Sequence, residues 1–102
     1  MDKEDGLKAL EKYRDQIDDV DRRLVQLLNE RTKIVEQLGK VKEEMELPIY
    51  EPKREDQVYD NIVNSNAGPL PPDALKRLFE RIVDEMRTLQ RMNRKIREQS
   101  GD

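Results

Sequence analysis

The chain has 102 residues, of which 42% are charged and 34% are hydrophobic, so it is predicted to form one small domain. Its 20 basic and 23 acidic residues nearly cancel, which argues against a general attraction to nucleic acid or to an anionic membrane surface. The absence of His and Cys excludes catalytic thiols, Ser–His nucleophiles, redox cysteines and the common zinc sites. No apolar run approaches the roughly 20 residues that span a bilayer, and the polar N-terminus does not resemble a signal peptide, so we expect a cytoplasmic protein.

The first predicted element is a long helix over residues 7–46, organised by a heptad repeat of apolar side chains. One line of sevens starts at Leu10 and a second starts at Tyr13, and together they form a seam over residues 10–45. At about 1.5 Å per residue the helix is roughly 50 Å long, which exceeds the width of a small globule. Such a helix needs apolar cover along its whole seam, so we expect part of that cover to come from a second chain. Pro48 is expected to stop the helix.

Two shorter helices are predicted after the long one. Pro52 suits the first position of a helix over residues 53–65, and a run of turn-forming residues over 64–69 ends it. A third helix is expected over residues 72–97, and no stretch has the alternation of a strand. We therefore predict an all-α fold with one long and two shorter helices in a single domain, residues 1–102. The apolar side chains expected to face inward on the third helix are Leu75, Leu78, Phe79, Ile82, Met86, Leu89 and Ile96.

Arg31 interrupts the apolar seam of the first helix. A guanidinium in a core line is costly unless an anion meets it. Lys42 follows Arg31 by about three helical turns, so the two side chains point the same way roughly 16 Å apart and can hold one small dianion between them. Arg14 is about 42 Å from Lys42 along the same helix, so it reaches such a site only from a second chain packed antiparallel. A structural ion pair for Arg31 and solvated flanks for Arg14 and Lys42 are the alternatives.

A second charged cluster covers residues 51–55, at the start of the second predicted helix. Lys53 and Arg54 oppose the helix dipole in a first turn, whereas Glu55 suits it. The two cations therefore lack a local structural reason, which favours a role in a site. A solvated run of charges is the alternative.

Gln90 lies one turn after Met86, at the edge of the apolar stripe of the third predicted helix. An amide that faces a core must find a hydrogen-bond partner, which by default is a backbone or side-chain group of the protein. The basic residues within 91–97 are not accompanied by aromatic residues, so we do not expect nucleic-acid binding.

At these positions the sequence resembles the all-helical class of chorismate mutase, over nearly the whole chain from about residue 7 to residue 90. Each piece of the resemblance alone is weak, but the pieces occur in order and at suitable spacing, which makes the set specific. They are residues 14–21 (R-x-x-I-D-x-x-D in the family), 27–31 (L-L-x-E-R), 39–42 (G-x-x-K), 48–55 (P-[IV]-x-D-x-x-R-E) and 68–70, followed by 78–79 and 89–90.

The resemblance implies an intertwined homodimer with two active sites, each completed by one residue of the partner chain. The implied reaction is the 3,3-sigmatropic (Claisen) rearrangement of chorismate, a small dicarboxylate, to prephenate. This is the committed step towards phenylalanine and tyrosine. The implied reaction needs no cofactor, no metal and no covalent intermediate, which agrees with the absence of His and Cys.

Four positions carried over from the resemblance would contact the reacting part of the substrate. Arg31, together with Arg14 contributed across the dimer interface, would hold the two carboxylates. Lys42 and Gln90 would hydrogen-bond the ether oxygen. Lys42, Gln90 and Arg31 would therefore be the catalytic residues.

The other carried-over positions surround the polar end of the implied pocket. Glu55 would take the ring hydroxyl of the substrate, with Glu51 and Arg54 in support. Glu51 stands where the family usually has Asp, which is a mild change. Met86 stands where many members have a Ser whose hydroxyl touches the ligand, so we expect a water or backbone group there, or weaker binding.

Other functions are compatible with parts of this pattern. The nearest enzymatic alternative is isochorismate-pyruvate lyase, which resembles this fold and uses similar charges. A non-catalytic helical module that regulates an upstream pathway enzyme is the alternative from another class, although the complete set of candidate residues argues against it. A plain coiled-coil dimer explains the seam but not Arg31 within it.

Overall fold

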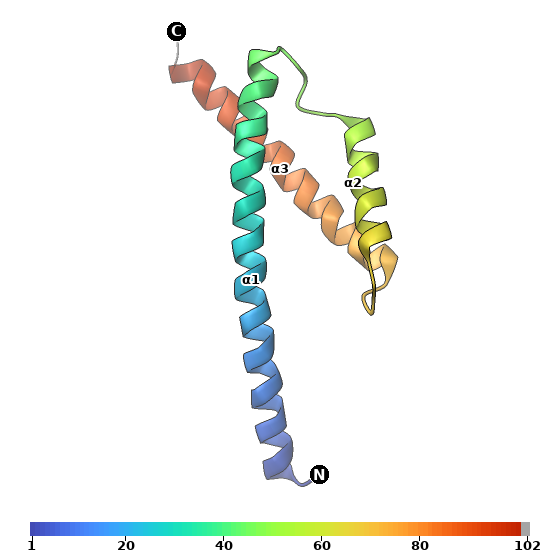
Figure 1. The fold of residues 1–102 in the computed structure, drawn as a ribbon. Coiled ribbons are helices and arrows are strands. Elements are labelled where there is room, and N and C mark those ends of the chain that lie inside the picture. The colour runs from blue at the N-terminus through green and yellow to red at the C-terminus, as the bar shows by residue number, and fades with distance from the viewer. Residues whose placement is uncertain (101–102) are drawn as a thin grey trace. The chain divides into compact units, whose positions relative to one another are not determined.

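Three helices follow one another along the chain, joined by two short connections (Figure 1). The computed structural model describes residues 1–100 and contains three α-helices: α1 (Lys3–Glu44), α2 (Pro52–Ser65) and α3 (Pro72–Ser100). No strand occurs in the described residues, and the predicted all-α class with three helices is confirmed. None of the helices in this part of the chain is long and apolar enough to cross a membrane.

The segment Met1–Lys33 forms one of two compact units and contains most of α1. The helix begins before the predicted residue 7, because the Asp2 carboxylate accepts a hydrogen bond of 2.8 Å from the Asp5 backbone N–H. The seam residues Ile17 and Leu24 are more than half exposed. The apolar seam of this unit is therefore a solvent-exposed surface in the single chain.

α1 ends at Glu44 rather than at the predicted residue 46, and it ends in a Schellman motif. The Leu47 N–H donates to the Lys42 carbonyl oxygen at 2.7 Å, and the Glu46 N–H donates to the carbonyl oxygen of Glu43 at 3.1 Å. Glu46 adopts the left-handed conformation that this motif requires, with φ of 59°.

Replacing Glu46 with glycine is expected to stabilise the protein. The left-handed conformation costs a residue with a side chain about 1–2 kcal/mol, and the greater freedom of unfolded glycine offsets part of that gain, leaving about 0.5–1 kcal/mol. Urea unfolding of Glu46→Gly measures this gain. Lys40→Gly, inside the helix, is the matched control and should lower stability by about 0.5–1 kcal/mol. A Glu46→Gly protein no more stable than the unaltered chain would contradict the left-handed conformation of Glu46 at the end of α1.

The second unit begins at Ile34 and contains the end of α1 together with α2 and α3. Pro52 is the first residue of α2, as expected for proline at a helix start. α3 starts at Pro72 and continues to Ser100, beyond the predicted residue 97. The two helices pack against each other, and the chain reverses its direction in the connection between them (Figure 1).

The connection between α2 and α3 is held by its own hydrogen bonds. The Asn66 side-chain oxygen accepts a bond of 2.9 Å from the Gly68 N–H, and the Asn66 amide donates to the Leu70 carbonyl oxygen at 2.8 Å. Gly68 has φ of 78°, a conformation that glycine adopts without steric cost. The predicted break therefore has a defined local structure.

In the second unit, the final turns of α1 are crossed by the middle of α3 (Figure 1). The buried residues there are Val35, Gly39 and Lys42 on α1, and Val83 and Gln90 on α3. The three positions on α1 are spaced by three and four residues, so they share one face of the helix. Polar side chains thus occupy part of a small core.

The heptad seam lies on another face of this part of α1. Leu38 and Val41 are about half exposed, whereas the neighbouring line of residues is buried. Packing within the chain therefore does not use the seam, which leaves it available for other apolar cover. On α3, Leu78 and Ile96 were predicted to face inward but are exposed in the single chain.

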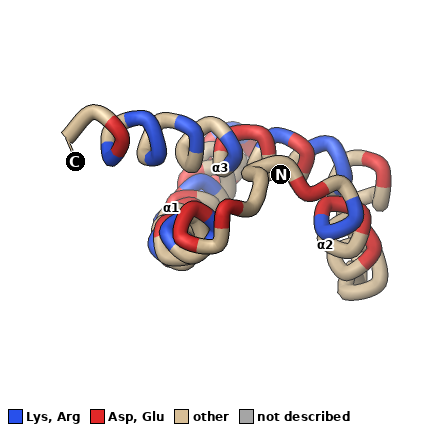
Figure 2. Tube along the Cα trace, turned by 90° about the horizontal axis from the view of Figure 1, so that it is seen from above, with Lys and Arg blue, Asp and Glu red and all other residues tan. Residues whose placement is uncertain are grey.

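Basic residues at the end of α3 hold the end of α1. Arg94 donates to the Leu47 carbonyl oxygen at 3.2 Å, and Arg97 forms an ion pair with Glu43. Cations are favourable near a helix C-terminus, where carbonyl groups lack partners. Elsewhere along the helices, acidic and basic residues are interspersed (Figure 2). The basic tail of the sequence therefore has a structural role within the chain.

Candidate active site

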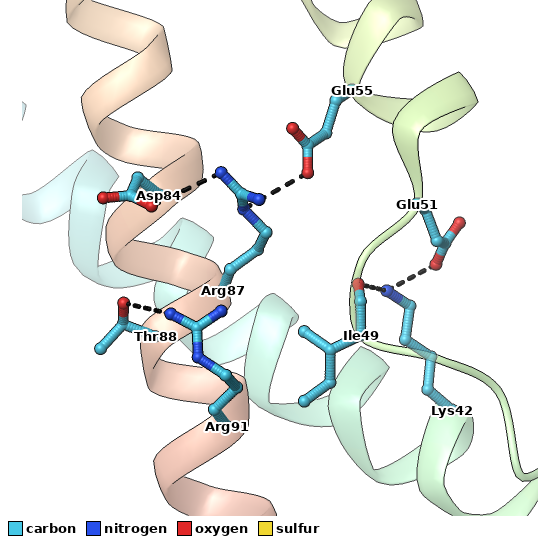
Figure 3. Close-up of polar contacts among 8 residues, drawn as sticks. All are labelled: Lys42, Ile49, Glu51, Glu55, Asp84, Arg87, Thr88 and Arg91. Atoms are coloured by element: carbon cyan, nitrogen blue, oxygen red, sulfur yellow. Dashed lines mark hydrogen bonds and ion pairs between the residues drawn. The ribbon is translucent and has the colours of Figure 1, made fainter.

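Lys42 is a buried charge on the last turn of α1, with a fractional exposure of 5%. Its ammonium donates to the Ile49 carbonyl oxygen at 2.9 Å and pairs with the Glu51 carboxylate at 2.5 Å (Figure 3). A buried ammonium is costly without such partners. Because an ammonium carries three N–H groups, Lys42 retains one donor for a third acceptor.

Gln90 is a buried amide on α3, with a fractional exposure of 7%. Its side chain lies against Gly39, where an added Cβ would be 3.5 Å from Gln90 Cγ. Gly39 shares a helix face with Lys42, so Gln90 lies beside the face that carries the ammonium. The Gln90 side-chain oxygen is buried and has no hydrogen-bond partner. The orphaned atom is an acceptor, so a partner for it must supply an N–H or O–H group.

The size of residue 39 is expected to control this contact. In Gly39→Ala the new methyl meets Gln90 at ordinary van der Waals distance, and alanine favours a helix interior, so stability should rise by about 0.5–1 kcal/mol. Gly39→Leu should overpack the contact, displace Gln90 and destabilise the protein by about 1–3 kcal/mol. Thermal unfolding of both variants measures the difference. Equal stability of the two variants would show that α3 does not approach Gly39 closely.

Glu55 on α2 faces Arg87 on α3 across the two helices (Figure 3). The Arg87 Nε lies 3.4 Å from a Glu55 oxygen, and one terminal nitrogen of Arg87 lies 3.4 Å from the Asp84 carboxylate. The Arg87 guanidinium also lies over the Tyr50 ring, 5.3 Å from its centroid. The Glu55 carboxylate is therefore held from the α3 side by a partly buried cation.

Tyr59, one turn after Glu55 on α2, is partly buried near several acidic residues. Burial, together with the charges of Glu55 and Glu80, raises the pKa of Tyr59 above its ordinary value, while Arg87 opposes the shift. The phenol therefore stays neutral and able to donate throughout the neutral pH range.

The other predicted site residues are distributed over both units. Arg54 is exposed on the first turn of α2, and Met86 is partly buried on α3. Arg14 is exposed and Arg31 is partly buried, and both belong to the unit Met1–Lys33. The second unit therefore brings Lys42 and Glu51 into contact and places Gln90 and Glu55 on the helices that pack beside them.

Arg87 was missed as a candidate from the sequence. The helical spacing contained a usable signal, because Arg87 follows the buried Val83 by four residues and precedes Gln90 by three. A cation on a face with such neighbours needs an anion, and Glu55 provides it.

These groups suit the binding of a polar organic anion. A buried ammonium and a buried amide provide donors, while Glu55 provides an acceptor held by Arg87. Donors fixed in a buried place stabilise negative charge more strongly than donors in water. The arrangement can therefore orient an anionic molecule and stabilise charge that develops on one of its oxygens.

The sequence matches the chorismate mutase type II family over residues 13–91. A bifunctional chorismate mutase/prephenate dehydratase of Aquifex aeolicus is 30% identical over 89 residues, which is 83% of this chain and 25% of that protein. The chain thus spans about a quarter of the length of the bifunctional relatives that it matches. A chorismate mutase of Methanocaldococcus jannaschii is 25% identical over 83% of this chain and 87% of that protein.

A solved structure has the same fold. Chorismate mutase (form II) from Thermus thermophilus superposes with a TM-score of 0.79 and 31% sequence identity, covering 81% of this chain and 94% of that chain. Its form I gives a TM-score of 0.74 with 32% identity, over 76% of this chain and 98% of that one. The family match covers well over half of the sequence, and the structural similarity covers about four fifths of this chain. The chain belongs to the chorismate mutase type II family.

Proposed function

We propose that this chain is a chorismate mutase that rearranges chorismate to prephenate in the biosynthesis of phenylalanine and tyrosine. The observation that carries the proposal is the pair of buried donors, Lys42 and Gln90, beside Gly39 in a member of this family. Two relatives and a solved structure that bear the name chorismate mutase support it.

The proposed mechanism rests on fixed charge and needs no cofactor. As the C–O bond of the substrate breaks ahead of C–C bond formation, negative charge gathers on the ether oxygen. The free proton of Lys42 and the amide of Gln90 then bind that oxygen more strongly in the transition state than in the ground state. Arg31 holds a carboxylate of the substrate in the folded conformer from which the reaction proceeds, which lowers the entropic barrier.

We place the remaining candidate residues at the polar end of the pocket. Glu55 accepts a hydrogen bond from the ring hydroxyl of the substrate. Its contact with Arg87 supports the orientation of the carboxylate. Glu51 holds the Lys42 ammonium, and Arg54 supports this end from the exposed first turn of α2. Met86 cannot donate a hydrogen bond through its thioether, so we expect a water or backbone group to supply that contact, or weaker binding.

The proposed active form is an intertwined homodimer, in which the whole chain acts as one chorismate mutase-like domain. The exposed seam of α1, including Ile17 and Leu24, supports a second chain as its cover. A helix of the length from Arg14 to Lys42 rises about 42 Å, so we assign the Arg14 of each site to the partner chain.

Loss of chorismate absorbance with the purified protein tests the proposed function. We expect saturable turnover to prephenate, and a large loss of turnover in Arg31→Ala. Pyruvate release from isochorismate, without turnover of chorismate, would replace the proposal by a lyase. A folded protein with neither activity would favour a regulatory module.

A further inference from the structure

We propose that Arg87 is a positioning residue, which orients the Glu55 carboxylate towards the ring hydroxyl of the substrate. This inference rests on the proposed function, because it assigns a role within the same site. Arg87 comes from α3 and Glu55 from α2, so their contact joins two helices at the candidate site (Figure 3).

The surroundings of Arg87 restrict where its guanidinium can point. Its Nε lies 3.4 Å from Glu55, one terminal nitrogen lies 3.4 Å from Asp84, and the Tyr50 ring covers one face at 5.3 Å. The side chains of Arg87 and Glu55 are 28% and 17% exposed, so solvent screens this pair less than it screens an exposed pair. A planar guanidinium held on three sides presents its Nε to the carboxylate in a fixed direction.

The contact is also incomplete in a way that suits a ligand site. The Arg87 Nε is buried, yet it has no hydrogen-bond partner, because the nearby Glu55 oxygen lies outside hydrogen-bonding geometry. Catalytic contacts are often long in the absence of substrate and shorten in the complex. We infer that Glu55 turns onto the Arg87 N–H when its other oxygen accepts the substrate hydroxyl.

A double-mutant cycle on kcat/KM tests this inference. Arg87→Ala and Glu55→Ala are each expected to lower kcat/KM about tenfold, and the double variant should lose little more than Glu55→Ala alone, since Arg87 acts through Glu55. A merely structural ion pair would lower thermal stability without this coupling in kcat/KM. The inference would be overturned if the two losses in kcat/KM multiply in the double variant, or if Arg87→Ala keeps full activity.

Controls separate this outcome from other failures. Arg81→Ala removes an exposed arginine of α3 that pairs within its own helix, and it should leave kcat/KM unchanged. If Arg87→Ala does not fold, Arg87→Lys and Glu55→Gln carry the same cycle, because lysine keeps the charge but not the planar fork. Absence of turnover in the unaltered protein would overturn the proposed function itself, whereas turnover with independent losses overturns only the role of Arg87.

Discussion

Lys42→Ala is expected to lower kcat/KM for chorismate by about 10²–10³, equivalent to about 3–4 kcal/mol of transition-state stabilisation. Lys42 is buried, and two of its three donors are already held by Ile49 and Glu51, so the third has a fixed direction. A fixed donor needs no reorganisation when charge develops on the ether oxygen. Steady-state measurement of chorismate consumption gives the loss, and circular dichroism of the variant checks its helical content.

Lys40→Ala is the matched control for this experiment. Lys40 lies on the same turns of α1 but is exposed, so its replacement should change kcat/KM less than about twofold. A comparable loss in both variants would indicate a general effect of charge on α1. A loss below about threefold in Lys42→Ala would show that Lys42 does not bind the reacting oxygen.

Mixing two inactive variants is expected to restore activity, if each site takes Arg14 from one chain and Arg31 from the other. In a dimer of one Arg14→Ala chain and one Arg31→Ala chain, one site lacks both arginines and the other retains both. Random association makes half of the dimers mixed, so about one quarter of the activity of the unaltered protein should return. Refolding the two purified variants together and measuring turnover gives this fraction.

The mixture of Arg31→Ala with Lys42→Ala is the control. Both of these residues are assigned to the same chain of a site, so every site in the mixed dimer lacks one of them and activity should stay low. Recovery of activity in this control would contradict the assignment of Arg31 and Lys42 to the same chain of a site. Failure of the first mixture to recover, with mixed dimers present by mass spectrometry, would place Arg14 outside the shared site.

The helices could be predicted because their signals are local. Pro52 at the start of α2 and the turn residues near Gly68 act through their own backbone conformations. The end of α1 was less predictable, because Glu46 occupies a left-handed position that the sequence does not mark with glycine. Contacts such as that of Arg94 with Leu47 depend on how α3 crosses the end of α1. The spacing of apolar residues along the sequence does not determine the angle at which two helices cross.

The candidate site was partly accessible from sequence. Lys42 and Gln90 are polar residues next to apolar lines, a conflict that is visible without coordinates, and the structure buries both. Their roles stay predictions. Arg87 was missed because its relevance comes from Glu55 on another helix, and only the packing of α2 on α3 brings the two together.

The two connections of the chain differ in how freely their length can change. The connection between α1 and α2 is anchored by Lys42 at Ile49 and by Arg94 at Leu47, so an insertion there would shift the candidate site. The connection after α2 is held by hydrogen bonds of the Asn66 side chain, and its residues 67–71 are exposed. Exposed connections with independent local structure tolerate insertions well. This second connection is therefore the place to introduce a fluorescent label or a fused domain.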